Sequence, residues 1–509
     1  MQRLRVSATD FACNALFLVI LVANLSRTLR HAMWRDELQI FQLGRGSSSL
    51  FDLFARLKYE AHGGVWDGLV WLITRVTADP AWMQVLQAVL AAVVWIVIYR
   101  WSPFTRLEKF LLLFSYFLFF EYFVMSRSYV VVALLGFAFV AVRQHQPRQI
   151  VLAWLLLGLL ANLVMHATIW SMALAVFFAI EQRERGRAFY VGAALYLAFL
   201  AFGITTMIPA ADYGPWGQSV AFDPMRLART LVLPLGALVP VNLEWIGAAR
   251  EFLNGSSSVG SSLALPSFWN PNPTQYVVAL ADQPLWLSLV FAAPLVVCWL
   301  ISRDRIRVAE FATVYGGVLT FATLWDFPGS SRHHGIVFMA LLAGAWLARA
   351  KFAGDRWSTW TLRSLLLVSA IGGVLTLASE LRPFSQSRNA AQWLQQNELA
   401  AAFLVGSRDA QVSSVAGYLG RPIYYLECEC LGTFIIWNHA RTSPLTAEQF
   451  RERLARVVNP AAGDNILIRN RPLLPEELPL DTGLSATLLK SFTGTVETDE
   501  NYWIYRVTR

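Results

Sequence analysis

Residues 109–142 read KFLLLFSYFLFFEYFVMSRSYVVVALLGFAFVAV, and this stretch decides the class of fold. It contains two apolar runs, 109–125 and 128–142, each close to the about 20 residues that a helix needs to cross the hydrocarbon core of a membrane. The turn around Arg127 that separates them is too short for a soluble loop. The stretch therefore predicts a hairpin of two membrane-spanning helices.

Similar apolar runs recur along the first three quarters of the chain. Hydrophobic residues make up 56% of the 509 residues and charged residues only 15%, whereas about 25% of the residues in soluble proteins are charged. This composition excludes a disordered chain and argues against a soluble enzyme. We predict a polytopic α-helical membrane protein with about 11 transmembrane helices, near 11–29, 82–99, 109–125, 128–142, 150–165, 167–181, 189–208, 285–302, 308–325, 334–350 and 363–380. The region 225–247 could hold a further span or a helix in the membrane interface.

The net charge of +8 is distributed unevenly. Residues 384–509 carry 12 Lys and Arg and 13 Asp and Glu, whereas the other 383 residues carry 30 and 21. The basic residues of the apolar part fall in alternate short connections, as in the cytoplasmic loops of membrane proteins, and this argues against a nucleic-acid-binding surface. An odd number of spans then places 30–81, 209–284 and the tail 384–509 outside the cytoplasm. The several Arg residues in 30–81 are the one discordant observation.

We therefore divide the chain into a transmembrane domain, 1–383, with external loops 30–81 and 209–284, and a soluble extracytoplasmic domain, 384–509. In the tail, AAFLVGS, PIYYLE, NILIRN and YWIYRVT predict strands and QVSSVAGYL predicts a helix, which together indicate a small α/β domain. The N-terminal segment has no clear cleavage site and reads as a retained first helix. The chain carries no Walker loop or G-x-G-x-x-G fingerprint, so we expect no nucleotide cofactor.

The four cysteines are too few for a disulfide scaffold. Cys13 and Cys298 lie in apolar runs and read as small core residues. Cys428 and Cys430 lie two residues apart, and neighbours at that spacing in a strand point the same way and are bridged only with strain. We expect a structural role for this pair, with a redox or metal-binding role as the alternative.

Ionisable residues at a membrane boundary are costly and therefore mark candidate sites. Asp36 and Glu37 follow directly after the first apolar run. Adjacent carboxylates there can serve as a general base and as a metal or hydrogen-bond partner. The alternative is an ordinary helix N-terminus, where acidic residues complement the helix dipole.

A second candidate site is Glu60-Ala61-His62-Gly63-Gly64. It follows the amphipathic segment FDLFARLKY, which can lie along the membrane surface. The two glycines would let the backbone approach a lipid head group closely. The alternative is a turn between two interfacial helices.

Further candidates lie at predicted external turns. Arg127 is placed to meet a phosphate, which a guanidinium group suits, although an Arg near a helix end also snorkels to the interface. His166 is predicted at the same depth and could equally be a packing residue. Arg332, with one of His333 and His334 at the start of a span, could hold an anion. Adjacent histidines point to different sides of a helix, so we do not expect both to bind one metal.

The order of these features resembles the integral-membrane GT-C glycosyltransferases, in particular the bacterial protein-mannosyltransferase-like and aminoarabinose-transferase-like branch. The resemblance covers most of residues 10–380. It rests on the first span, the Asp-Glu pair, the E-x-H-G-G-x-W element, the hairpin turn at S-R-S-Y and the late R-H-H, in this order and on one side of the membrane.

The resemblance implies an enzyme of the bacterial cytoplasmic (inner) membrane with its active site on the periplasmic side. Such an enzyme would move a sugar from a polyprenyl-phosphate donor to a lipid, glycan or protein acceptor, and direct displacement would invert the anomeric centre. It would also contact membrane lipids. Asp36 matches the general base of the family and Glu37 its acidic neighbour.

The resemblance also implies roles for the remaining candidates. Glu60 and His62 match the element in which relatives contact the donor phosphate or a metal, although some relatives have Lys at the position of His62. Arg127, His166, Arg332 and His333 would contact the donor phosphate or substrate. A divalent cation, Mg²⁺ or Mn²⁺, would have Asp36, Glu60 and His62 as its ligands.

Three other functions are compatible with a polytopic membrane protein. A surface-polysaccharide polymerase or ligase would use Arg and His in a large external loop, and the loop 209–284 is long but contains no histidine. A lipid or glycolipid transporter predicts inverted repeats, and no repeat is visible. A structural or assembly protein would use the tail for docking and would not need Asp36.

Overall fold

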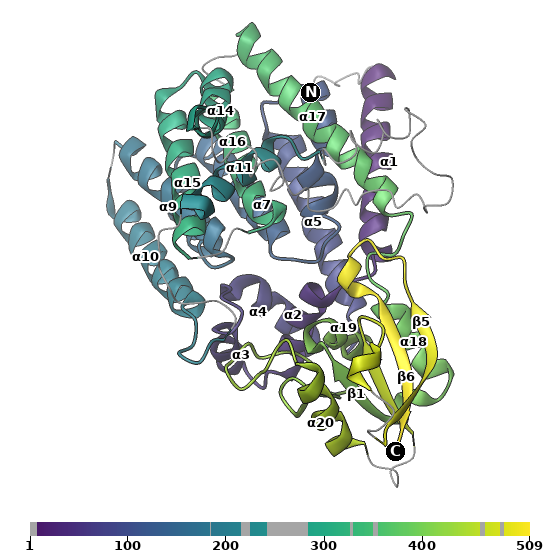
Figure 1. Ribbon diagram of the computed structural model, residues 1–509. Helices are drawn as coiled ribbons and strands as arrows, with labels where there is room; N and C mark the ends of the chain where they lie inside the picture. The colour runs from purple at the N-terminus through teal and green to yellow at the C-terminus, as the bar shows by residue number, and fades with distance from the viewer. Residues whose placement is uncertain are drawn as a thin grey trace. The chain divides into compact units, whose positions relative to one another are not determined.

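The computed structural model describes residues 8–183, 185–214, 224–241, 284–325, 329–349, 355–458, 464–478 and 483–509 (Figure 1). The chain divides into two compact units. Unit 1 consists of Met1–Arg30, Val85–Ile204 and Gln218–Ser379, and unit 2 consists of His31–Gln84, Thr205–Gly217 and Glu380–Arg509.

Unit 1 is built from helices that coincide with most of the predicted spans, the run 109–125 being the main exception. Four of the described helices, α1, α5, α10 and α17, are long and apolar enough to cross a membrane. The chain is thus mostly helical with four candidate spans, and the number of about 11 stays a prediction. The helices carrying unit 1 are α1 (Ala8–Arg30), α5 (Ala81–Trp101), α6 (Arg106–Leu113), α7 (Tyr129–His145), α8 (Ile150–Leu160), α9 (Met165–Glu181), α10 (Arg187–Met207), α11 (Pro224–Leu238), α14 (Pro284–Ser302), α15 (Arg305–Leu324), α16 (Ser331–Arg349) and α17 (Arg356–Ser379). Helix α11 lies in the region that the sequence left open, whereas most of the loop 209–284 falls outside the described residues.

The stretch 109–142 is not the simple pair of straight helices that we predicted. Helix α6 ends at Leu113, a short π-helix η1 (Phe117–Glu121) follows, and α7 begins only at Tyr129. Polar groups interrupt the apolar run here: the Tyr116 hydroxyl donates to Glu121 at 3.0 Å, and both side chains are buried. Short π-helices are rare and often occur at functional sites.

Unit 2 joins the loop after the first span to the C-terminal tail. The loop folds into α2 (Arg35–Gly46), α3 (Leu50–Leu57) and α4 (Gly64–Thr74). Helix α2 packs against α19 (Asp409–Leu419), and the Gln42 side chain donates to the Ser413 carbonyl at 2.8 Å. The compact unit that contains the tail therefore includes 31–84, a segment that the sequence-based division assigns to the transmembrane domain.

The tail forms a six-stranded mixed sheet in the order β3-β2-β1-β4-β6-β5. Strands β1, β2 and β4 are parallel, whereas β3, β5 and β6 pair antiparallel to their neighbours. The sheet and its helices confirm the predicted α/β domain. Its elements are α18 (Ser387–Gln396), β1 (Phe403–Ser407), α19, β2 (Ile423–Tyr425), β3 (Cys430–Gly432), α20 (Ala447–Val457), β4 (Asn465–Arg469), β5 (Ser485–Phe492) and β6 (Tyr502–Thr508).

Helices cover both faces of the central strands, whose successive residues point to opposite sides of the sheet. Leu404 and Ile466 pack with α18 and α19 on one face, and Val405 and Leu467 pack with α20 on the other. The edge strands β3 and β5 were not predicted from the sequence. Their side chains are mostly exposed, so they lack the hydrophobic pattern that marks the central strands.

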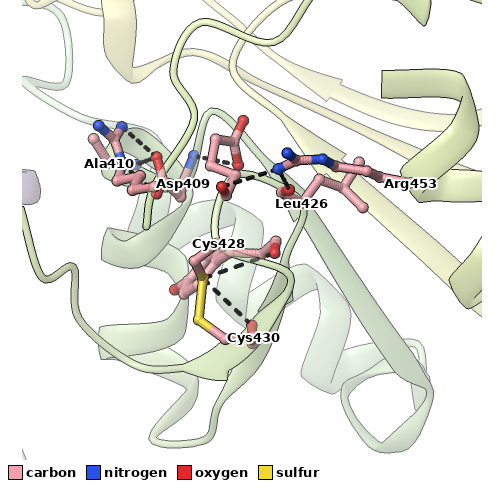
Figure 2. The surroundings of a disulfide bond; sticks show 9 residues. Asp409, Ala410, Leu426, Cys428, Cys430 and Arg453 are labelled. Carbon is pink, nitrogen blue, oxygen red and sulfur yellow. Dashed lines mark hydrogen bonds and ion pairs between the residues drawn. A yellow bond between two sulfur atoms is a disulfide. The ribbon is translucent and has the colours of Figure 1, made fainter. Parts of the chain in front are cut away.

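Cys428 and Cys430 form a disulfide, which the sequence analysis did not expect (Figure 2). Cys428 lies in the turn between β2 and β3 rather than within a strand, so the argument from strand geometry does not apply. Arg453 of α20 donates to the carbonyls of Leu426 and Glu427 beside the bridge, at 2.7 and 3.0 Å. Cys13 and Cys298 are free thiols.

Candidate functional site

Asp36 and Glu37, neighbours in the first turn of α2, have different environments. The Glu37 carboxylate is fully buried, accepts the Trp34 backbone N–H at 3.2 Å and pairs with the His31 ring at 2.9 Å. This is the usual way in which the third residue of a helix holds the start of that helix. The Asp36 side chain is 25% exposed. Glu37 therefore stabilises the turn, and Asp36 is the more exposed carboxylate of the pair.

Arg35 connects Asp36 to a group of acidic residues near the C-terminus. Its guanidinium lies 3.7 Å from the Asp36 carboxylate and 3.6 Å from the Asp499 carboxylate. Burial alone would lower the pKa of Arg35, but the carboxylates of Asp36, Glu500, Glu497 and Asp499 raise it above its ordinary value. Arg35 therefore stays charged and partly neutralises the carboxylates around it.

Glu60 is held against α2, the helix that carries Asp36. The Gln39 side chain donates to the Glu60 carboxylate at 2.7 Å. Gln39 lies three residues after Asp36, and residues at this spacing share one side of a helix. Within unit 2 the structure therefore brings Glu60 to the side of α2 that carries Asp36.

His62 is half-buried and directly precedes the N-cap of α4. Ala61, just before it, adopts a positive φ of 54°, a conformation that is uncommon outside glycine. A Cβ atom at Gly64 would lie 2.6 Å from the Phe54 ring. Close packing between α3 and α4 is thus a sufficient reason for this glycine, and an approach to a lipid head group stays a prediction.

A metal site formed by Asp36, Glu60 and His62 stays a prediction. Among the residues that the structure describes, no group of three or more His, Cys, Asp or Glu side chains is arranged to hold a metal ion.

The remaining candidates form a cluster in unit 1, in which Arg127 and His166 are buried and Arg332 and His333 are half-buried. The rings of His166 on α9 and His333 on α16 have centroids 5.1 Å apart, and His334 lies 6.1 Å from His166. Arg127, buried in the turn before α7, and Arg332 in the first turn of α16 lie close enough to act on the His333 ring through their charges. Three segments far apart in the sequence therefore meet at one cationic cluster.

A hydrogen bond at the start of α16 determines which nitrogen of the neutral His333 ring carries the proton. The Ser330 backbone N–H donates to His333 Nδ1 at 2.9 Å. Because Nδ1 accepts this hydrogen bond, the neutral ring carries its proton on Nε2, which is then a donor. His333 can therefore donate a hydrogen bond to an anion without a net charge of its own.

Tyrosines that the sequence analysis did not select complete this cluster. The Tyr122 hydroxyl donates to the Arg332 carbonyl at 2.7 Å, and its ring stacks on Tyr129 with centroids 5.0 Å apart. Tyr129 in turn lies 6.0 Å from the His333 ring. Tyr129 belongs to the S-R-S-Y turn, so the motif that marked Arg127 could also have marked Tyr129. Tyr122 lies in a run of aromatic residues, where nothing in the sequence distinguishes it from its neighbours.

The eight predicted site residues thus form two groups. Asp36, Glu37, Glu60 and His62 lie in unit 2, and Arg127, His166, Arg332 and His333 lie in unit 1. The structure brings Glu60 to the side of α2 that carries Asp36 and brings the rings of His166 and His333 together. The roles of all eight residues in one reaction remain a prediction.

The comparisons with known proteins give one likeness. No family model and no curated protein matches the chain. Among solved structures, the chain is similar to the arabinofuranosyltransferase AftD from Mycobacteria, with 12% sequence identity and a TM-score of 0.38. The similarity covers 97% of this chain and 41% of the AftD chain, so this chain spans less than half the length of that protein.

Proposed function

We propose that the chain is a membrane glycosyltransferase that moves a sugar from a polyprenyl-phosphate donor to an acceptor on the extracytoplasmic face. The observation that carries the proposal is the cluster of Arg127, Arg332, His166 and His333 within the helical unit. Ionisable groups among apolar helices are costly and are retained mainly where they serve function. An anionic lipid phosphate is a ligand that suits two guanidinium groups and a histidine donor.

The proposed reaction is a single displacement. Asp36 takes the proton from an acceptor hydroxyl or amine, whose oxygen or nitrogen attacks the anomeric carbon of the sugar. The bond between that carbon and the phosphate oxygen breaks, and the lipid phosphate leaves with the electron pair. Arg127, Arg332 and His333 stabilise the charge that develops on the leaving phosphate. Attack opposite to the leaving group inverts the anomeric centre.

Two further observations support the placement of this reaction outside the cytoplasm. The basic residues of the short connections predict which side is cytoplasmic. Disulfides such as Cys428–Cys430 persist in oxidising compartments and are rare in the cytosol. Both agree with a unit 2 that faces the periplasm or the cell exterior.

The test is transfer by the purified protein in proteoliposomes with a panel of radiolabelled polyprenyl-phosphate sugars. We expect Asp36→Asn to lower transfer by about 10²- to 10⁴-fold, as the loss of a general base does. Asp52→Asn is the matched control, because Asp52 lies on α3 of the same unit, is 29% exposed and pairs with Arg56. The control should transfer as wild type does.

Other outcomes would contradict this proposal. Undiminished transfer by Asp36→Asn would remove Asp36 as the base. Extension of a glycan into long polymers would favour the polysaccharide polymerase or ligase. No transfer from any donor, together with substrate-dependent transport in vesicles, would favour a transporter.

A further inference from the structure

Glu500 is a fully buried carboxylate at the end of the short helix η6 (Thr498–Glu500) in the C-terminal tail. One oxygen accepts the Arg35 backbone N–H at 3.3 Å. The other accepts from the Ser385 and Tyr502 hydroxyls, both at 2.7 Å, and from the Ser414 hydroxyl at 3.4 Å. Hydroxyls of the tail therefore orient this carboxylate toward the first residue of α2.

The Arg35 amide needs such a partner. The first amides of a helix have no acceptor within the helix itself, and Arg35 is the first residue of α2. Glu500 thus acts as a capping group supplied by a segment 465 residues away. A carboxylate at this end also complements the helix dipole. The residue that follows the capped amide is Asp36.

This contact lies at a defined edge of the sheet. The strands β1 and β4 are parallel and pair Ser407 with Arg469 at their carboxyl ends. Asn470, directly after β4, donates to the Asp499 carbonyl at 3.2 Å. Ligands of open α/β sheets bind at the carboxyl ends of strands where the chain order reverses, and here the order reverses between β1 and β4.

A second connection ties the same helix to the tail. The Gln39 side chain accepts the Ile435 N–H at 3.0 Å and donates to the Ile435 carbonyl at 2.7 Å. The same amide nitrogen donates to Glu60. The tail therefore contacts α2 at two residues about one helical turn apart. These are Arg35, next to Asp36, and Gln39, which binds Glu60.

We propose that Glu500 is a positioning residue for Asp36, so that the C-terminal sheet domain forms part of the catalytic machinery. This inference rests on the proposed role of Asp36 as the base. The domain would act through the backbone at the start of α2 rather than by touching the sugar donor.

The first test does not depend on activity. In the full-length protein, hydrogen–deuterium exchange of a peptide covering 31–41 should become about tenfold faster in Glu500→Ala, because the Arg35 amide loses its acceptor. Glu500→Gln retains an oxygen and should exchange nearly as slowly as wild type. Glu427→Ala is the matched control: this buried carboxylate lies in the turn between β2 and β3 of the same domain and bonds to Ser407, Arg408 and Asp409 instead of α2.

The second test measures kcat and KM for sugar transfer by the same variants. A displaced base should lower kcat by up to about 100-fold, since small misplacements have effects of that size, while the KM for the donor stays within about twofold. Glu500→Gln should restore most of kcat, and Glu427→Ala should leave it unchanged.

The two tests separate the possible failures. Unchanged exchange at 31–41 in Glu500→Ala would overturn the positioning role, whatever the activity. Faster exchange in a protein whose wild type transfers no sugar would uphold the contact and refute the glycosyltransferase. If Glu500→Ala fails to fold, Glu500→Asp shortens the side chain by one methylene and keeps the charge. It should show the same change to a smaller extent, and wild-type exchange in that variant would also overturn the role.

Discussion

At the scale of single residues, adjacent positions in this chain carry out different tasks. Glu37 is buried and bonded to His31 and Trp34, whereas Asp36 is partly exposed beside Arg35. The sequence D-E cannot distinguish them, because the distinction comes from which side of α2 faces the rest of unit 2. The same holds for Glu500, which resembles any other acidic residue of the tail until Arg35 is placed next to it.

Two buried carboxylates lead to a pH prediction. Burial raises the pKa of Glu427 and of Glu500 from 4.5 to about 7. Between these values the folded protein holds protons that the unfolded chain has released, so stability is highest below about pH 4.5 and decreases as the pH rises to about 7. Each group contributes at most about 3–4 kcal/mol to this change.

The prediction can be checked by denaturant unfolding of the purified protein between pH 4.5 and 8, followed through the unfolding of the sheet domain. The double variant Glu427→Gln and Glu500→Gln should unfold with a smaller dependence on pH than wild type does. An unchanged pH dependence in that variant would show that other groups are responsible.

At the scale of elements, the break between α6 and α7 distinguishes the observed fold from a simple hairpin. Helix α17 approaches this break closely: a Cβ atom at Gly373 would collide with the Phe114 carbonyl oxygen. Backbone carbonyls cannot move aside as a flexible side chain can. The glycine is therefore needed for the contact between α17 and the segment that leads into the S-R-S-Y turn.

We expect Gly373→Ala to destabilise the protein by about 1–3 kcal/mol, the usual effect of inserting a methyl group into a packed interior. Gly316→Ala on α15 is the matched control, because a Cβ atom there meets nothing within 4 Å. That change should be neutral or stabilise the helix by up to about 1 kcal/mol. Thermal unfolding in detergent measures both, and equal melting temperatures for the two variants would contradict the predicted contact.

At the scale of the whole molecule, each compact unit is assembled from segments that are distant in the sequence. Unit 2 combines the loop after the first span with the last 130 residues, Glu380–Arg509. A truncation at 383 therefore removes the sheet and α19, against which α2 packs. The tail cannot be treated as an appendage that is independent of the residues preceding it.

The oxidation state of the cysteines tests the compartment of unit 2. Protein isolated from cells with a thiol-blocking reagent and then denatured should show two blocked cysteines, Cys13 and Cys298. Reduction should release two more, Cys428 and Cys430. Mass spectrometry of the peptides identifies each one. Four blocked cysteines before reduction would place unit 2 in a reducing compartment.

The sequence by itself determined the class of the protein. Long apolar runs with few charges leave helical membrane spans as the natural structure, and alternating hydrophobic residues in the tail predicted β1, β2, β4 and β6 correctly. These features are local, since each depends on residues that are near one another in the chain. The selection of candidate residues was also local, because it rested on ionisable groups at the boundaries of apolar runs.

Only the tertiary structure decided which of those residues meet. His166 and His333 are 167 positions apart in the sequence and have ring centroids 5.1 Å apart, and Glu500 caps a helix that begins at Arg35. No local pattern records such pairs, because they arise from how helices and strands pack. The disulfide and the edge strands were missed for a related reason: turns and exposed edges lack the hydrophobic period from which elements are predicted.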